Sequence, residues 1–205
     1  MSALSILCLV LSFPFAFVFH DGEEAIVQRR WILAHEEKLS GLLPWFRPIL
    51  KYLSRINTGA FIVAAVEELT VILASTAYSF VKGAYAMEIW SALFMAFSLH
   101  LLVHIAQAFV VRGYVPGLFT SFLLLPYAYY GVYSIYLAMS LTEMLMWSVA
   151  GVIFMATNLI FAHWLGILIL GQDKNGAGWN TGNSLFWQCT AAGIECYSPA
   201  RDAVN

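Results

Sequence analysis

The sequence predicts an all-α protein, a polytopic membrane helical bundle of about five transmembrane helices plus one interfacial amphipathic helix. Two observations carry this prediction. Of the 205 residues, 61% are hydrophobic and only 11% are charged, whereas soluble domains carry roughly a quarter charged residues. In addition, five apolar stretches reach the roughly 20 residues that a helix needs to cross a bilayer. Because so few charges cannot cover a water-facing surface, the main surrounding medium is lipid.

The predicted spans, in chain order, cover residues 3–25, 59–80, 88–111, 114–138 and 145–170. The first has the length of a signal peptide, but it lacks a basic start and a small-residue cleavage site, so we interpret it as a retained helix. The spans form one transmembrane domain over residues 1–170, and residues 171–205 are predicted to form a cytoplasmic tail.

The longest predicted loop, residues 26–57, contains the interfacial helix, at residues 42–56. Apolar residues there recur at helical spacing, while Arg47, Lys51 and Arg55 line another face. This pattern is typical of a helix that lies in the plane of the membrane interface. Anchoring is the main interpretation of this helix, and a lid over a lateral entrance is the alternative.

Basic residues set the predicted orientation. With the N-terminus outside and the C-terminus in the cytoplasm, nine of the ten Lys and Arg residues lie on the cytoplasmic side, in agreement with the positive-inside rule. The opposite orientation would place only one of them there. We therefore expect an integral protein of the plasma or inner membrane. The net charge of −2 argues against a broad basic surface for nucleic acid.

Costly polar side chains lie inside four of the predicted spans. A charge at the centre of a span costs roughly 2.5–3.5 kcal/mol on insertion scales, so such residues indicate a function. Counted at about 1.5 Å per residue from the cytoplasmic span ends, His20, Glu67, His104 and His163 all lie roughly 12–13 Å deep. The sequence thus predicts one polar layer, whose candidate metal ligands are His20, Glu23, Glu24, Glu67, Glu68, His100, His104 and His163.

Helical spacing places several of these candidates on shared faces. Glu23 and Glu24 follow His20 at i+3 and i+4, one turn away. His100 and His104 stand at i and i+4, an arrangement by which two imidazoles of one helix share a metal ion.

The other members of the layer have less definite roles. Glu67 and Glu68 point about 100° apart, so only one of them aims squarely at the bundle axis, and the sequence leaves open which. Gln107 and Asn158 are predicted to orient metal ligands through hydrogen bonds.

This ligand chemistry suits particular metals. Histidine and carboxylate without thiolate favour iron, manganese or zinc, and so many ligands fit two ions better than one. We expect two metal ions per chain, with iron favoured and zinc or manganese as alternatives. Di-iron carboxylate sites in helical bundles also draw Glu and His from four helices, although their E-x-x-H order is absent here.

The resulting functional hypothesis is a membrane metalloenzyme with a dinuclear site that acts on a lipophilic small molecule. The reaction is either oxygen activation by an iron oxidoreductase or metal-assisted hydrolysis by a zinc hydrolase. No catalytic residue is assigned, and Glu24 and Glu67 are candidate general bases. The alternative is a cation or proton transporter that uses the same layer, which the apolar outer halves of the spans disfavour. Membrane lipids and the substrate are the expected partners.

Two motifs resemble a known family. The segment HDGEE at 20–24 matches the signature of the HXXEE membrane protein family. The segment HLLVHIAQAFVVRGYVPGLFTSFLLLPYAYY at 100–130 resembles its second hallmark, an H-x-x-x-H-x-x-Q helix that leads through Y-x-P-G into a proline-containing span. The resemblance covers residues 15–170. It supports His20, Glu23, Glu24, His100, His104 and Gln107 as site residues and attaches no reaction to them.

Overall fold

The computed structural model describes residues 3–42, 44, 47–81, 83–171, 188–189 and 196–197. Five helices in this part of the chain are long and apolar enough to cross a membrane, namely α1 (Ala3–Leu42), α3 (Thr58–Val81), α4 (Ala86–Val111), α5 (Leu118–Ala138) and α6 (Leu141–Leu170). They confirm the predicted helical membrane bundle, and the protein is therefore an integral membrane protein.

Residues 175–205 form a separate unit. Its described residues are two short strands, β1 (Gln188–Cys189) and β2 (Cys196–Tyr197), which pair antiparallel with Cys189 opposite Cys196. The rest of the predicted tail lies outside the described residues, so its prediction stays untested.

Helix α1 continues far beyond the predicted first span, and the prediction that residues 26–42 belong to a loop was wrong. The helix is 40 residues long. It continues because the segment that follows Gly22 holds strong helix formers and has neither glycine nor proline before Gly41. The extension also has an apolar face, because Ile32 and Leu39 are buried there. Packing therefore holds this polar segment against the end of the bundle.

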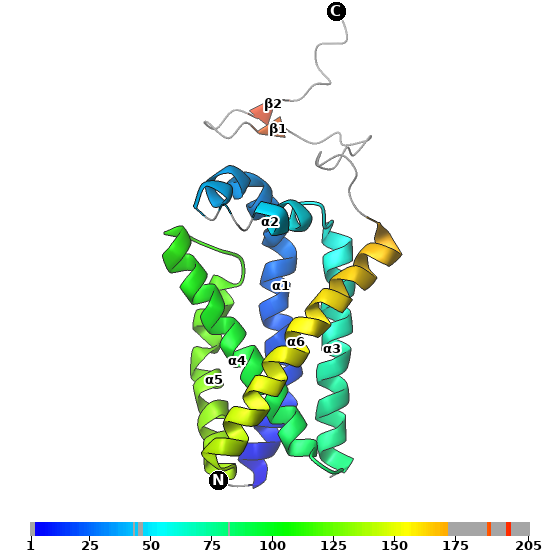
Figure 1. Ribbon diagram of the computed structural model, residues 1–205, viewed down its shortest axis with the longest axis vertical. Helices are drawn as coiled ribbons and strands as arrows, with labels where there is room; N and C mark the ends of the chain where they lie inside the picture. The colour runs from blue at the N-terminus through cyan, green and yellow to red at the C-terminus, as the bar shows by residue number, and fades with distance from the viewer. Residues whose placement is uncertain are drawn as a thin grey trace, which may run out of the picture. The chain divides into compact units, whose positions relative to one another are not determined.

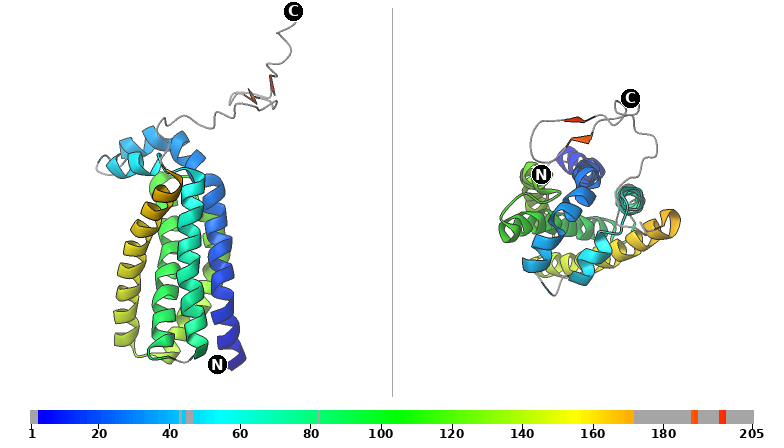
Figure 2. Two further views of the ribbon diagram at one scale, coloured as in Figure 1. Left: turned by 90° about the vertical axis from the view of Figure 1, so that its right-hand side faces the viewer. Right: turned by 90° about the horizontal axis from the view of Figure 1, so that it is seen from above.

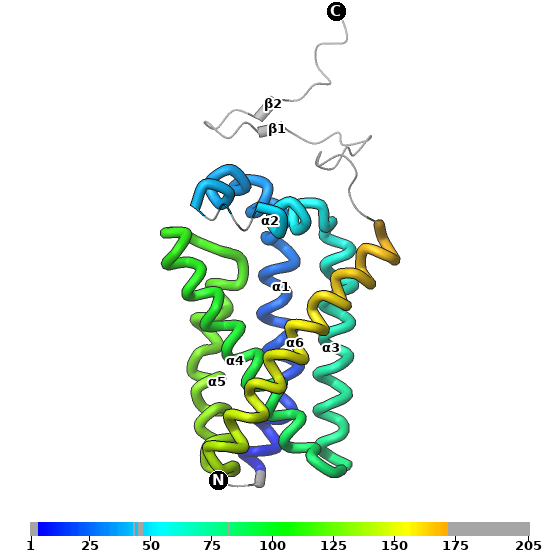
Figure 3. The backbone as a smooth tube through the Cα atoms, in the orientation of Figure 1, coloured from blue at the N-terminus to red at the C-terminus, as the bar shows by residue number. Residues whose placement is uncertain are grey.

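Helix α2 (Arg47–Leu53) is shorter than the predicted interfacial helix, with Leu50 as its buried residue. Leu50 packs in one cluster with Leu39 of α1 and with Val111 and Val115 near the end of α4. Figure 3 shows α2 lying across the end of the bundle at which α6 ends. The cluster fastens α2 to the bundle at that end.

Close helix crossings hold the bundle together. Figure 1 shows α6 running diagonally over α3 and α4, its two main neighbours. A Cβ atom added at Gly151 would collide with the backbone of Ala92 in α4, and one at Gly166 with the backbone of Ala60 in α3. Small residues of this kind let membrane helices approach closely. On the other side α4 packs against α5, and α1 contacts α3, α4 and α5 (Figure 2).

An aromatic core fills the bundle between α1 and α4. The ring of Phe13 in α1 lies 5.7, 5.3 and 5.4 Å, centroid to centroid, from those of Trp90, Phe94 and Phe97 in α4. Each of these four side chains is at most 2% exposed. Two turns further along α1, the ring of His20 packs edge-on at 5.8 Å against Phe97. The helix faces that form the apolar core therefore continue directly into the polar site.

Candidate metal centre

Four side chains converge between α1 and α4. One nitrogen or oxygen atom of each of His20, Glu24, His100 and His104 lies within 4.8 Å of the corresponding atoms of the others. His100 is partly buried and the other three are buried. Each helix contributes two residues one turn apart, so helical geometry alone places both on the facing side. Within the described residues, this is the group of histidines and carboxylates that is suited to hold a metal ion.

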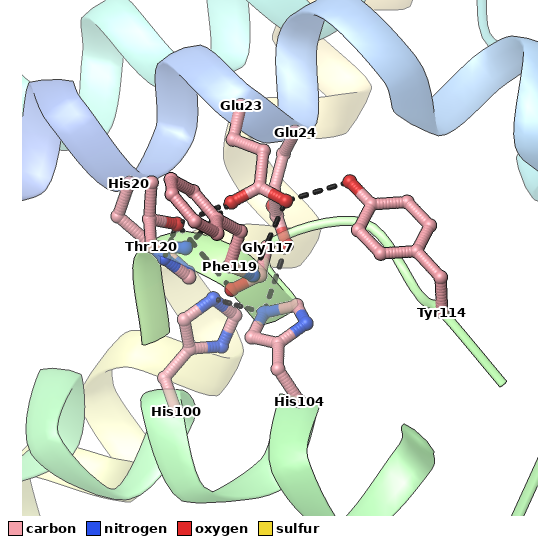
Figure 4. A network of polar contacts seen from close by, with 9 residues as sticks. All are labelled: His20, Glu23, Glu24, His100, His104, Tyr114, Gly117, Phe119 and Thr120. Atoms are coloured by element: carbon pink, nitrogen blue, oxygen red, sulfur yellow. Dashed lines mark hydrogen bonds and ion pairs between the residues drawn. The ribbon is translucent and has the colours of Figure 1, made fainter. Parts of the chain in front are cut away.

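The four side chains, here called the His–Glu group, point toward one another (Figure 4). The Nε2 atom of His104 lies 2.9 Å from Nε2 of His100 and 2.8 Å from Oε1 of Glu24. The ring of His20 lies 5.1 and 5.0 Å from those of His100 and His104. Lone pairs of several rings and a carboxylate thus share one small space, which favours a cation there.

The group fits a metal ion by two further criteria. The Nε2 atom of His20 is buried without a hydrogen-bond partner, which costs about 1–3 kcal/mol for an unsatisfied polar atom. An ion would give this nitrogen a partner. Ligand atoms about 2.1 Å from a tetrahedral ion lie roughly 3.4 Å apart. The atoms of the group, which lie up to 4.8 Å apart, therefore need to approach one another by about 1.4 Å at the widest point.

Thr120 of α5 fixes the tautomer of His20. Its Oγ1 atom donates to Oε2 of Glu23 at 2.7 Å and lies 2.9 Å from Nδ1 of His20. Because a hydroxyl has one proton and the carboxylate is the stronger acceptor, Nδ1 of His20 carries a hydrogen and donates it to Thr120. Nε2 then keeps its lone pair, and it is the ring nitrogen of His20 that has no hydrogen-bond partner. Hydrogen bonds of this kind orient metal-binding histidines in proteins.

Glu23 does not join the group but holds the start of α5. Its Oε1 accepts hydrogen bonds from the Tyr114 hydroxyl at 2.6 Å and from the Phe119 N–H at 3.4 Å, and its Oε2 accepts one from the Thr120 N–H at 2.8 Å. A carboxylate at a helix N-terminus satisfies free N–H groups and is favoured by the helix dipole. Glu23 of α1 thus caps a helix far away in the sequence.

Tyr114 lies in the loop between α4 and α5, outside the spans. Burial, together with the hydrogen bond that it donates to Glu23, raises the pKa of its hydroxyl above the usual range. Tyr114 therefore stays protonated and keeps donating to Glu23 at physiological pH.

Gly117 closes the site at the start of α5. Its φ angle is +78°, a left-handed conformation that favours glycine. A Cβ atom at this position would lie 2.9 Å from Oε1 of Glu24 and 3.0 Å from the Cε1 atoms of His104 and His20. The backbone of the loop before α5 can approach the His–Glu group only because residue 117 has no side chain.

The other predicted site residues lie elsewhere. Glu68 is buried, with Oε1 unpartnered, so it is the one of the two adjacent glutamates that faces the interior. Glu67 is partly buried and accepts a hydrogen bond from Asn158 at 2.9 Å. His163 is buried, packs against Phe61 and donates from Nδ1 to the Leu159 carbonyl at 2.8 Å. Gln107 is exposed. None of these five joins the four converging side chains.

These contacts tie residues 20–24 to residues 100–120, and a family model spans both segments. The model, described as "Protein of unknown function with HXXEE motif", matches residues 11–131, more than half of the chain. The chain belongs to the HXXEE family. No curated protein and no solved structure matches it.

The motif that names the HXXEE family has two structural roles here. Its histidine, His20, and its last glutamate, Glu24, belong to the His–Glu group. Its first glutamate, Glu23, instead binds the start of α5 and, through Thr120, the far side of the His20 ring. His163 and Asn158 lie beyond the matched residues.

Sequence reasoning assigned no role at the site to Tyr114, Gly117 or Thr120, although the first and second belong to the Y-x-P-G segment. The Y-x-P-G segment was a usable signal, because glycine after proline marks a turn and the turn directly follows the two-histidine helix. Only the fold, however, brings that turn back over His20 and Glu24.

Proposed function

We propose that this HXXEE protein is a membrane metalloenzyme that binds a metal ion through His20, Glu24, His100 and His104 and acts on a lipophilic substrate. The observation that carries the proposal is the convergence of four ligand atoms at a buried place where Nε2 of His20 has no other partner. A metal ion bound there would supply Lewis-acid or redox chemistry that the protein side chains lack.

Iron is the favoured ion. Four protein ligands would close a tetrahedral zinc site, as in structural zinc proteins, whereas catalytic zinc keeps an open position. Iron with histidine and carboxylate ligands commonly retains open positions for oxygen or substrate. The proposal therefore favours an oxidoreductase, and hydrolysis at zinc requires one of the four groups to leave the ion. One ion suffices for this proposal, and the second ion expected from the sequence stays a prediction.

The surroundings favour an enzyme over a transporter. On the side of the His–Glu group that faces the start of α1, the rings of Phe13, Phe97 and Trp90 fill the bundle. A transiting cation needs polar access from both sides, and the described core offers a dry aromatic barrier on one of them. With the N-terminus outside, as the positive-inside rule favours, the side of the His–Glu group opposite this aromatic barrier faces the cytoplasm.

The residues around the group have definite parts in this proposal. Thr120 and Glu23 hold the His20 ring with Nε2 toward the ion. Phe97 shields the same ring from water. Of the two candidate general bases, Glu24 belongs to the His–Glu group, whereas Glu67 is engaged with Asn158.

Elemental analysis of gently solubilised full-length protein tests the metal site. We expect about one ion per chain, lost in His100→Ala and retained in Gln107→Ala, a control on the exposed side of the same helix. An absorption spectrum would identify ligand-bound iron. Metal-free, well-folded wild-type protein, or equal metal loss in both variants, would refute the metal site.

A lipid comparison tests the reaction. Extracts of cells that express wild-type protein or His100→Ala at equal levels are compared by mass spectrometry. We expect a lipophilic compound to be oxidised or cleaved only with the wild type. Identical extracts, combined with cation flux into proteoliposomes that disappears in His100→Ala, would replace the enzyme with the transporter.

A further inference from the structure

A line of exposed side chains runs along the outer face of α5, which lies at the edge of the bundle (Figure 1). The inner face of α5 packs against α4 and α1 with buried residues such as Ala128, Gly131 and Ile135. The exposed residues, here called the tyrosine seam, are Phe119, Phe122, Pro126, Tyr129, Tyr133 and Tyr136. They follow one another at alternating intervals of three and four residues. This spacing is typical of the contact line between two helices that pack side by side.

The tyrosine seam places a hydroxyl group near the middle of the bilayer. Helix α5 has 21 residues, which corresponds to about 32 Å and matches the roughly 30 Å of the hydrocarbon core. Tyr129 lies eleven residues after Leu118 and nine before Ala138, and its side chain is 74% exposed. Tyrosines in membrane proteins usually gather at the two membrane surfaces, where their hydroxyls meet water. Tyr136, close to the end of α5, fits that pattern, but Tyr129 does not.

The hydroxyl of Tyr129 has no hydrogen-bond partner among the described residues, and its ring stacks on that of Tyr133 at 6.4 Å. Such a hydroxyl is costly in hydrocarbon, because lipid tails can neither donate nor accept a hydrogen bond. Tyr127, two residues earlier, lies inside the bundle and has a partner, since its hydroxyl donates to the Leu9 carbonyl at 3.1 Å. A partner from outside this chain is therefore expected for Tyr129.

Pro126 adds a backbone acceptor to the same face of α5. A proline has no N–H group, so the carbonyl of Phe122, four residues earlier, lacks its regular helical hydrogen bond. Transmembrane helices tolerate such a proline when neighbouring groups, including those of another helix, supply the missing hydrogen bond. The tyrosine seam therefore carries both hydrogen-bond donors and an acceptor that lipid tails cannot satisfy.

A second copy of this chain is the partner that these groups fit. Two copies that cross the membrane in the same orientation pair about an axis perpendicular to the membrane, so each residue meets residues of its own depth. A hydroxyl both donates and accepts hydrogen bonds. The hydroxyl of Tyr129 in one copy can therefore bond the same hydroxyl in another copy, and the two seams are complementary without any change of sequence.

We infer that this protein forms a homodimer in the membrane through the tyrosine seam, with α5 of one copy packed along α5 of the other. The spacing of the seam corresponds to the left-handed packing of helices that cross at about 20°. The inference goes beyond the proposed function and does not rest on it, because the His–Glu group lies between α1 and α4 of a single chain.

Disulfide cross-linking in native membranes tests the position of the interface. Serine first replaces the natural cysteines of the full-length chain, Cys8, Cys189 and Cys196. Single cysteines are then introduced in the seam by Tyr129→Cys and Tyr133→Cys. The matched control is Ile153→Cys, at a residue that is 62% exposed near the middle of α6. We expect a cross-linked dimer at both seam positions and only background cross-linking at the control position, with gel filtration showing that each variant is folded.

A second measurement isolates the contribution of the hydroxyl. Full-length wild type, Tyr129→Phe and Tyr127→Phe are labelled, incorporated into phosphatidylcholine liposomes and compared by energy transfer between copies over a range of protein-to-lipid ratios. Loss of a hydrogen bond between helices should weaken dimerisation roughly three- to thirtyfold in Tyr129→Phe. Tyr127→Phe removes a hydroxyl whose partners, Leu9 and Ser12, lie in its own chain. This variant should dimerise like the wild type.

Three outcomes would overturn the inference. These are equal cross-linking at the control and seam positions, a wild type that stays monomeric at every protein-to-lipid ratio, and equal dimerisation of Tyr129→Phe and the wild type. If a monomeric wild type instead retains a hydroxyl- or carbonyl-bearing lipid that Tyr129→Phe loses, that lipid covers the seam in place of a second copy. None of these measurements depends on metal content, so failure of the dimer and failure of the proposed metal centre are distinguishable.

Discussion

Substitution of Gly117 by alanine adds one methyl group at the point where the loop before α5 touches the His–Glu group. Two costs follow from the structure. At φ +78° an alanine backbone costs about 1–2 kcal/mol. The new Cβ would also lie 2.9–3.0 Å from atoms of Glu24, His104 and His20, roughly half an ångström closer than favourable carbon contacts. Three of the four proposed ligands would therefore have to move.

We expect Gly117→Ala to lower both metal content and the free energy of unfolding, the latter by at least about 1–2 kcal/mol. For a chain of 205 residues, this corresponds to a fall of roughly 2–8 °C or more in the midpoint of thermal unfolding. Elemental analysis and thermal melting in one detergent measure the two effects. Gly22→Ala is the matched control, because a Cβ there meets nothing within 4 Å.

The control variant Gly22→Ala lies in the interior of α1. It should leave the free energy of unfolding unchanged or raise it by up to about 1 kcal/mol. The same chemical change at two glycines near the site is thus predicted to have opposite signs. Retention of wild-type metal content and melting temperature by Gly117→Ala would refute the close approach of the loop to the ligands.

Three further predictions follow from the same contacts. Thr120→Val should weaken metal binding about 10–100-fold, because the Nδ1 hydrogen of His20 loses its acceptor. Thr120→Ser keeps a hydroxyl and should bind the metal ion like the wild type. Equal metal affinities in the two variants would contradict the tautomer argument. The raised pKa of Tyr114 means that its hydrogen bond stabilises the folded protein fully below the ordinary tyrosine pKa, about 10, and that this stabilisation is lost as the pH rises further. The difference in melting temperature between wild type and Tyr114→Phe should therefore shrink above that pH. A constant difference would contradict the hydrogen bond to Glu23. Gly151→Val should destabilise the bundle by about 1–3 kcal/mol or more by forcing α6 away from α4, measured by thermal melting beside Gly113→Ala, whose Cβ meets nothing within 4 Å.

The sequence was sufficient to predict the bundle and to include all four residues of the His–Glu group among the candidate ligands, for reasons that His100 and His104 illustrate. Their i, i+4 spacing places them on one face whatever the tertiary structure, and their cost in lipid indicates a role. Depth counting was less selective. It placed Glu67 and His163 in the same layer, but depth does not give the direction in which a side chain points around its helix. In the structure Glu67 therefore meets Asn158, and His163 meets Leu159 and Phe61.

The role of Glu23 and the length of α1 were beyond sequence reasoning. Glu23 precedes Glu24 by one residue, so their side chains diverge by about 100°, and only the position of α5 reveals what Glu23 faces. For residues 26–42 the charges indicated a loop, although their propensity was helical. Tertiary packing of Ile32 and Leu39 made the difference, because an apolar stripe stabilises a polar helix outside the bilayer.

The unbroken α1 helix explains why these features occur together. Phe13, Phe17, His20, Glu24, Gln28 and Ile32 follow one another at intervals of three or four residues, so they form one stripe along the helix. Along this stripe the surroundings change from the aromatic core to the His–Glu group and then to the buried Ile32 of the extension. A break after residue 25 would have separated Gln28 and Ile32 from Glu24. Because the helix is continuous, the packing of Ile32 and Leu39 at the end of the bundle also fixes the direction in which His20 and Glu24 point.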